Sequence, residues 1–166
     1  MMLVRQLLAI AILPFTMAVI IPMWIGRANR AAFVAPVTPA DYALIVGGIA
    51  AAIVGLALFI STNYLFWTRG RGTLAPWDPP REFVAVGPYR YVRNPMISGV
   101  ILIILAESLV WRSWQIGEWA AAFFVINLIY IPLVEQPMLD ARFGASYREY
   151  KKRVRMFLPR LAPWQQ

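Results

Sequence analysis

The sequence contains no cysteine and no histidine in its 166 residues. Without cysteine the chain has no disulfide and no thiolate nucleophile, and zinc sites built on Cys or His are excluded. Without histidine it has no imidazole, the side chain whose ordinary pKa suits proton transfer near neutral pH. Any chemistry must therefore use carboxylates, arginine, tyrosine, amides and backbone groups.

Charged residues are also scarce. They make up 14% of the chain, hydrophobic residues make up 60%, and the mean hydropathy is +0.60. A soluble domain of this length rarely has such a composition. The length allows one compact domain, and no internal repeat or long linker divides residues 1–166. The sequence therefore predicts one all-α domain, a polytopic membrane helical bundle.

Four long apolar stretches predict about four transmembrane helices. They are residues 7–25, residues 42–66, Pro95–Val110 and residues 119–134. Pro14 and Pro22 lie within the first stretch, where prolines in lipid usually kink a helix without ending it. Small residues at helical spacing in the second, from Gly47 to Gly55, predict close packing against a neighbouring helix.

The third and fourth stretches have sixteen residues each, fewer than the roughly 20 that a perpendicular span requires. We expect a hairpin that turns at residues 111–118 and whose cytoplasmic ends stop below the lipid headgroups, leaving room for a polar pocket. Residues 1–66 thus form two N-terminal transmembrane helices. Residues 67–166 form a polar loop, the short helical hairpin and an amphipathic tail.

The basic residues predict the orientation of these helices. With the N-terminus inside, Arg5, five arginines between Arg69 and Arg93, and seven Lys/Arg between Arg142 and Arg160 are cytoplasmic, which is thirteen against three outside. This asymmetry places both termini in the cytoplasm. The net charge of +8 is then explained by basic residues on the cytoplasmic face, where anionic lipids attract them. Nucleic-acid binding is not expected, because the sequence contains no recognisable module for it.

The segment after Glu135 has the pattern of an amphipathic tail. Apolar residues recur at helical spacing on one face, and basic residues occupy the others. The apolar residues are Leu139, Phe143, Tyr147 and Tyr150. Gly144 is expected to divide the segment into two short helices. Such helices ordinarily lie in the membrane interface.

Two motifs border the predicted hairpin. Gly-Pro-Tyr-Arg-Tyr-Val-Arg-Asn-Pro at residues 87–95 resembles the Gly-x-Tyr…Arg-His-Pro block of the isoprenylcysteine carboxyl methyltransferases and their phospholipid methyltransferase relatives. Glu-Gln-Pro-Met-Leu at 135–139, followed by Phe-Gly-Ala-Ser-Tyr-Arg-Glu-Tyr-Lys-Lys-Arg-Val at 143–154, resembles the Glu-Glu-x-x-Leu…Phe-Gly-x-x-Tyr-x-x-Tyr-x-x-x-Val tail of that family. The resemblance covers about residues 73–160.

The resemblance implies an integral membrane enzyme that uses S-adenosyl-L-methionine. It places the cofactor near the cytoplasmic surface beneath the C-terminal segments, and a lipophilic acceptor enters from the bilayer. The cofactor contacts that it implies are Arg81, Phe83, Val84, Tyr89, Asn94, Pro95, Met96, Ile97 and Glu135.

Methyl transfer from a sulfonium suits these side chains. It is an in-line displacement on a carbon already activated by its leaving group, so the protein mainly aligns the reactants and excludes water. No metal is required. Glu135 suits the cofactor's ammonium or a ribose hydroxyl, an arginine suits its carboxylate, and Tyr89 suits the sulfonium or the adenine.

Arg93, Glu135 and Asn127 are the candidate catalytic residues, and Asn127, Tyr130 and Ile131 the candidate contacts to the acceptor. Polar residues within apolar helices usually face a cavity or a partner. Each has an ordinary alternative. Arg93 can anchor to lipid phosphates, and Asn127 can hydrogen-bond between helices.

The chain departs from the family pattern at two informative positions. Asn94 replaces the usual His, which preserves hydrogen bonding without titration. Ile131 stands where the prenylcysteine enzymes place an arginine able to face an acceptor carboxylate. We therefore expect the acceptor to be a membrane lipid or a similarly apolar molecule.

Two other functions fit the sequence. A membrane reductase using NADPH could hold the 2′-phosphate in its basic loop. A non-catalytic protein could use its basic surface to bind anionic headgroups.

Overall fold

The computed structural model describes residues 11–165, apart from residues 32, 34 and 71–80. In this described part the secondary structure is helical and contains no β-strand, which confirms the all-α prediction there. The elements are η1 (Ala11–Ile20), α2 (Ile21–Ala28), α3 (Pro39–Leu65), η2 (Phe66–Gly70), η3 (Gly87–Arg90), α4 (Pro95–Val110), α5 (Trp114–Tyr130), η4 (Ile131–Glu135) and α6 (Gln136–Arg153).

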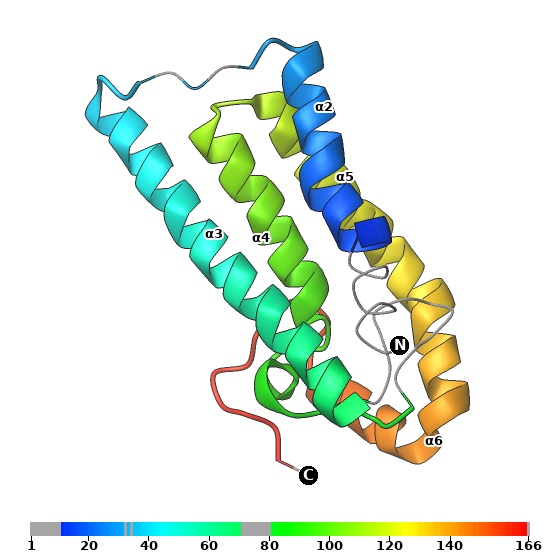
Figure 1. Ribbon diagram of the computed structural model, residues 1–166. Helices are drawn as coiled ribbons and strands as arrows, with labels where there is room; N and C mark the ends of the chain where they lie inside the picture. The colour runs from blue at the N-terminus through cyan, green and yellow to red at the C-terminus, as the bar shows by residue number, and fades with distance from the viewer. Residues whose placement is uncertain (1–10, 32, 34, 71–80, 166) are drawn as a thin grey trace.

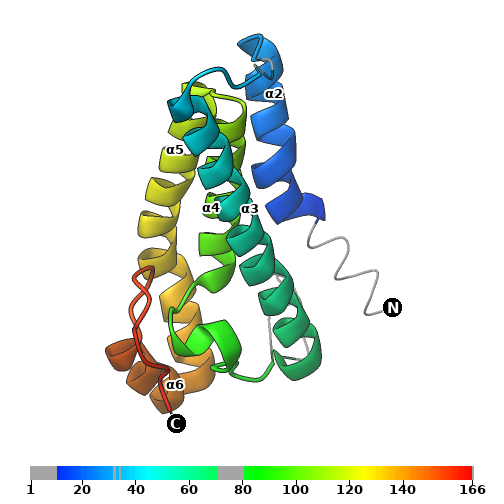
Figure 2. The same cartoon turned by 90° about the vertical axis from the view of Figure 1, so that its left-hand side faces the viewer.

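Four helical rods lie side by side, each antiparallel to the next in sequence (Figures 1 and 2). They are the continuous η1–α2 helix, α3, α4 and α5. The end of α3, the start of α4, η3, α6 and the C-terminal tail gather at one end of the bundle, drawn at the bottom of Figure 1 and called the lower end here. The short α4–α5 connection lies at the opposite end.

Two helices are long and apolar enough to cross a membrane, as judged by length and composition. They are Pro39–Gly70, of 32 residues, and Trp114–Arg153, of 40 residues. Ile12–Ala28 and Pro95–Val110 are shorter apolar helices. Val46, Ile53 and Ile60 on α3 are each more than 60% exposed, as expected of a surface that faces lipid. The number of crossings and their orientation stay predictions.

The helix α3 begins at a capping box. The Thr38 hydroxyl accepts a hydrogen bond from the Asp41 N–H at 3.2 Å, and the Asp41 carboxylate accepts one from the Thr38 N–H at 2.8 Å. These bonds satisfy backbone donors that the first turn of a helix would otherwise leave unpaired. Asp41 also forms an ion pair of 2.9 Å with Arg112, which ties the start of α3 to the α4–α5 turn.

The helices α3 and α4 approach closely through glycine. A Cβ added to Gly55 would lie 2.8 Å from the Gly99 carbonyl oxygen, and a Cβ on Gly99 would lie 2.8 Å from the Gly55 oxygen. Gly48 likewise faces Ala106 and Val110 of α4. Gly47 does not take part, because it has open space around it, so only part of the predicted small-residue face packs.

The prediction for α4 is confirmed at both ends, but the prediction for the fourth helix was wrong at both. That helix begins at Trp114, five residues earlier than expected, and the turn shortens to residues 111–113. The Ser108 hydroxyl donates to the Ser113 carbonyl oxygen at 2.9 Å and tightens this turn. Ile116 is buried while Glu118 is exposed, so the first turn of α5 is already amphipathic and needs no continuous apolar run.

The fourth helix also continues past its expected end at residue 134. The chain passes Pro132 through η4 and enters α6 without a break, so Glu135 lies inside a helix of 40 residues. A π-turn is wider than an α-turn and often occurs at functional sites. The helix is kinked within α6 at Gly144, whose φ of 54° and ψ of −124° are non-helical. The sequence analysis expected a division at this glycine.

The apolar face of α6 packs on the protein itself. Tyr147 and Tyr150 are buried with Ala85 and Val154, and Phe83, Leu139, Phe143 and Trp164 pack around them. The residues that the sequence pattern groups on one face of α6 thus pack together and cover the segment before η3, and a location of this helix in the membrane interface stays a prediction.

Candidate functional site

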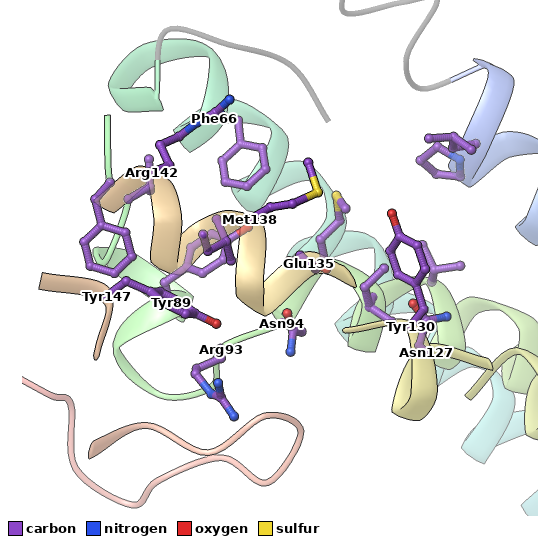
Figure 3. Close-up of a pocket in the computed structure, with 18 of the residues that line it drawn as sticks. Phe66, Tyr89, Arg93, Asn94, Asn127, Tyr130, Glu135, Met138, Arg142 and Tyr147 are labelled. Atoms are coloured by element: carbon purple, nitrogen blue, oxygen red, sulfur yellow. The ribbon is translucent and has the colours of Figure 1, made fainter. Parts of the chain in front are cut away.

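A cavity of about 550 Å³ lies at the lower end of the bundle, between η1, α5, α6 and the segment around η3. Figure 3 shows Asn127 and Tyr130 on one side of it and Tyr89 and Tyr147 on the other. This volume falls within the range of roughly 300–1,000 Å³ that is typical of small-molecule sites. Apolar side chains from η1, α4 and α5 line the part away from the tyrosines; they are Leu13, Met17, Val100, Phe123 and Ile126.

Ten of the residues chosen from the sequence line this one cavity. They are Phe83, Val84, Tyr89, Arg93, Asn94, Met96, Ile97, Asn127, Tyr130 and Glu135. Three others do not. Arg81 is exposed, and its backbone N–H donates to the Gly70 carbonyl oxygen at 2.8 Å. Pro95 and Ile131 are fully buried in the protein interior.

Tyr89 is held from two sides. It lies in the tight η3 turn, which begins at Gly87 with a φ of 58°, a conformation that glycine adopts without strain. The ring of Tyr89 stacks on Phe66, with centroids 5.6 Å apart, and its carbonyl oxygen accepts a hydrogen bond of 2.7 Å from the Tyr150 hydroxyl. Burial raises the pKa of Tyr89 well above its ordinary value, so its phenol stays neutral.

The C-terminal tail, residues 154–164, fixes the backbone that leads into α4. The Arg93 N–H donates to the Arg155 carbonyl oxygen at 2.9 Å, and both the backbone and the side-chain N–H of Asn94 donate to the Met156 carbonyl oxygen at 3.3 Å. The Arg160 N–H donates to the Tyr91 carbonyl oxygen at 2.9 Å. The amide of Asn94, which replaces the family's His, therefore holds the tail as well as lining the cavity.

Arg93 connects the two motifs electrostatically. The positive charge of Arg93 acts on the half-buried Glu135 carboxyl. Arg93 also acts on the buried Tyr147 through its charge and a side-chain hydrogen bond. The Nε of Arg93 is buried and has no hydrogen-bond partner among the described residues. Such an unpaired buried donor is costly unless a ligand satisfies it.

Asn127 is buried in α5, where its amide Nδ2 donates to the Phe123 carbonyl oxygen at 2.8 Å. The amide oxygen remains to receive a donor from the cavity. Figure 3 shows Asn127 beside Tyr130, with Glu135 and Asn94 between this pair and the tyrosine side. The bond to Phe123 holds the amide in one orientation.

Several cavity residues escaped the sequence reasoning. On α6, Met138, Leu139, Arg142 and Phe143 line the cavity together with Glu135. They lie three, four, seven and eight positions after it, which is the spacing of one helical face. This signal was available, but it required the helix to continue through Glu135. Phe66, at the end of α3, carried no comparable signal.

Comparison with known proteins finds one family and one relative. The family model described as phospholipid methyltransferase matches residues 42–146. Methanethiol S-methyltransferase 2 of Bradyrhizobium diazoefficiens is 33% identical to this chain over 76 residues, which are 44% of this chain and 27% of the relative. The chain thus spans little more than a quarter of that relative's length. No solved structure matches.

Proposed function

Because the chain belongs to the phospholipid methyltransferase family, we propose that its lower cavity binds S-adenosyl-L-methionine for methyl transfer to a lipophilic acceptor resident in the membrane. The observation that carries the proposal is the convergence of two motifs in one cavity. Arg93 of the first motif and Glu135 of the second are 42 positions apart in the sequence, yet both line it.

The residues present fit the functional groups of this cofactor. The unpaired Nε of Arg93 is a donor for its carboxylate, and the half-buried Glu135 carboxyl is an acceptor for its ammonium or ribose hydroxyls. The aromatic rings of Tyr89, Phe66 and Phe143 offer faces for the adenine or the sulfonium. When bound, the cofactor would supply a methyl group on a carbon that its sulfonium already activates.

The chain's own contribution is positioning and exclusion of water. The Tyr150 hydroxyl and the C-terminal tail hold the η3 segment rigidly, so Tyr89 and Arg93 are set before a ligand arrives. The apolar wall formed by Val100, Phe123 and Ile126 keeps water from the acceptor. Asn127, together with Tyr130, would orient the acceptor's polar atom.

We propose a neutral, apolar acceptor. Ile131 stands at the family's arginine position and is buried outside the cavity, and α5 has no basic residue in Trp114–Tyr130. An acceptor carboxylate would therefore find no cation on this helix. Methanethiol, which the relative's name gives as its substrate, is also small and uncharged. The cofactor end of the cavity, with both termini, is proposed to face the cytoplasm.

Calorimetric titration of the purified protein with S-adenosylmethionine tests the proposal. Glu135→Gln and Tyr89→Ala should each weaken binding by about 1–3 kcal/mol, as expected for a charged hydrogen bond or a cation–π contact. Glu118→Gln and Tyr64→Ala alter exposed residues outside the cavity and serve as matched controls. Wild-type affinity in both cavity variants, with folding intact, would sink the assignment, as would binding of NADPH in place of S-adenosylmethionine.

A further inference from the structure

A second hollow lies on another side of the bundle and takes no part in the proposed methyl transfer. This outer groove has a volume of about 500 Å³. Val54 of α3, Ile101 of α4 and Phe124 of α5 line its helical walls. Figure 2 shows α4 behind the space between α3 and α5, with the C-terminal tail beside the lower part of α5.

The surface of the outer groove suits a hydrocarbon chain. Among the described residues that line it, Tyr91 and Ser98 alone have polar side chains, and the Ser98 hydroxyl is already used, donating to the Asn94 carbonyl oxygen at 3.0 Å. Val54, which lines the groove, is 50% exposed, and so is Val125, which follows the lining residue Phe124 in α5. On an apolar helix long enough to cross a membrane, such a surface faces lipid chains.

The C-terminal tail closes the lower end of the outer groove. Phe157 and Pro159 of the tail line it, and the ring of Phe157 packs edge-on against Phe124 with centroids 5.1 Å apart. On the opposite side, Tyr91 lines it and accepts the backbone hydrogen bond from Arg160. The groove therefore ends at the place where the tail pairs with the segment entering α4.

The two segments that meet at this end carry only positive charge. Residues 83–106 and 154–166 contain Arg90, Arg93, Arg155 and Arg160 and no Asp or Glu. Arg93 belongs to the inner cavity. The other three lie one or two positions from Tyr91, Phe157 and Pro159 in the sequence. The Arg90 Nε donates to the Trp164 carbonyl oxygen at 2.6 Å, and the Arg160 guanidinium donates to the Arg153 carbonyl oxygen at 2.7 Å and keeps its other donors. An apolar groove that ends at a basic surface is complementary to a lipid with an acyl chain and an anionic headgroup.

We propose that the outer groove binds one anionic phospholipid. Its acyl chain lies along Val54, Ile101 and Phe124, and its phosphate contacts Arg155 and Arg160. By packing on Phe157, the lipid also stabilises the pairing of the tail with Arg93 and Asn94, both of which line the inner cavity. The lipid is thus a structural ligand that holds the inner cavity in shape, and binding it does not depend on methyl transfer.

Native mass spectrometry of the detergent-purified protein tests the site. Added phosphatidylglycerol should give a complex with one retained lipid, whereas phosphatidylcholine with the same chains should be lost more readily, and glycerol phosphate without chains should not bind. Val54→Trp fills the groove and should abolish retention. Val46→Trp alters the same residue type on the same helix, also exposed but outside the groove, and should retain the lipid.

A charge variant tests the headgroup contact. Combined Arg155→Gln and Arg160→Gln should remove the preference for phosphatidylglycerol over phosphatidylcholine. Combined Arg27→Gln and Arg30→Gln removes the same charge from exposed residues at the far end of the bundle and should keep the preference.

Hydrogen exchange tests the coupling without any need for enzyme activity. Phosphatidylglycerol should slow exchange of the amides of Arg93, Asn94, Arg160 and Trp164 in the wild type, because these amides donate the hydrogen bonds between the tail and residues 90–94. Val54→Trp should show no such slowing. Retention of the lipid by Val54→Trp, equal retention of both lipids by the wild type, or unchanged exchange on adding phosphatidylglycerol would each overturn the proposal.

Discussion

Arg93 interacts with residues of both motifs that border the inner cavity. It lies one position before Asn94, and its backbone is fixed by Arg155, while its side chain acts on Glu135 and Tyr147. A guanidinium offers several donors in a fixed plane. Its Nε is buried and its side chain lines the inner cavity, whereas an arginine that only anchors a helix to lipid phosphates extends its charged end into water.

Arg93→Ala should therefore reduce methyl-transfer turnover severely. Arg93→Lys should restore only part of it, because lysine keeps the charge but lacks the planar fork. Steady-state kinetics with S-adenosylmethionine as the varied substrate measures both variants. Arg148→Ala, which breaks only an exposed ion pair with Asp140, should leave turnover unchanged. Full turnover in Arg93→Lys would contradict this prediction and show that the reaction requires only a positive charge at this position.

Asn127 is proposed to contact the acceptor and not the cofactor. Asn127→Ala should lower turnover and leave affinity for S-adenosylmethionine nearly unchanged, because the amide is proposed to touch only the acceptor. Asn63→Ala is the matched control, since the Asn63 amide makes the same bond to a carbonyl oxygen four residues earlier, at 2.8 Å, outside the cavity. If Asn127 serves packing alone, its variant will lose thermal stability and keep its activity per folded molecule.

At the scale of elements, the contact between α3 and α4 brings two backbones together at Gly55 and Gly99. The reciprocal distances of 2.8 Å leave no room for a methyl group on either residue. Backbone on both sides cannot move aside as a flexible side chain would. This contact positions the start of α4, and therefore Asn94 and Met96 at the edge of the inner cavity.

Gly55→Ala should destabilise the protein by about 1–3 kcal/mol, the usual cost of overpacking. Gly47→Ala, two turns away on the same helix and in open space, should be neutral or stabilising by up to about 1 kcal/mol, because alanine favours the helix. Thermal unfolding of both variants in the same detergent gives the comparison. Equal melting temperatures would mean that the two helices can separate without loss of stability.

At the scale of the whole molecule, the bundle places an amphiphilic cavity at one end of long apolar helices. Polar groups from η3 and α6 line one side, and apolar groups from η1, α4 and α5 line the other. A water-soluble donor and an apolar acceptor can meet there from opposite phases. The exposed apolar surface of α3 and α5 is consistent with such a location.

The acceptor can be identified by labelling. Incubation of the protein with S-adenosylmethionine labelled in its methyl group and a total lipid extract should give an organic-soluble labelled product. A farnesylcysteine analogue should be a poor acceptor, because its carboxylate would meet no basic residue on α5. Efficient methylation of the analogue with no labelled lipid would contradict the proposed acceptor class. Boiled protein serves as the blank.

The sequence by itself determined the helical class, the bounds of α4 and the two motifs that border it. These depend on local properties: long apolar runs form helices, and Asn94-Pro95 is a natural helix start. The resemblance of the two motifs to the family pattern, together with the polar residues of the fourth apolar stretch, pointed to ten residues of the inner cavity. The sequence analysis placed both ends of the fourth helix wrongly, because it took the ends of the apolar run as the ends of the helix. The helix begins earlier, with an amphipathic turn, and continues later, through the π-turn at Pro132.

Only the tertiary structure decided how the tail is used. The bonds from Asn94 to Met156 and from Arg90 to Trp164 join residues 62 and 74 positions apart. No periodicity encodes contacts of that separation, because they arise when α6 folds back beneath the bundle and turns at Gly144. The same folding directed the apolar face of α6 inward, onto Phe83 and Ala85, and brought Met138 and Arg142 beside Glu135. Residue types and helical spacing set the available chemistry, and the path of the chain in space chose which groups meet.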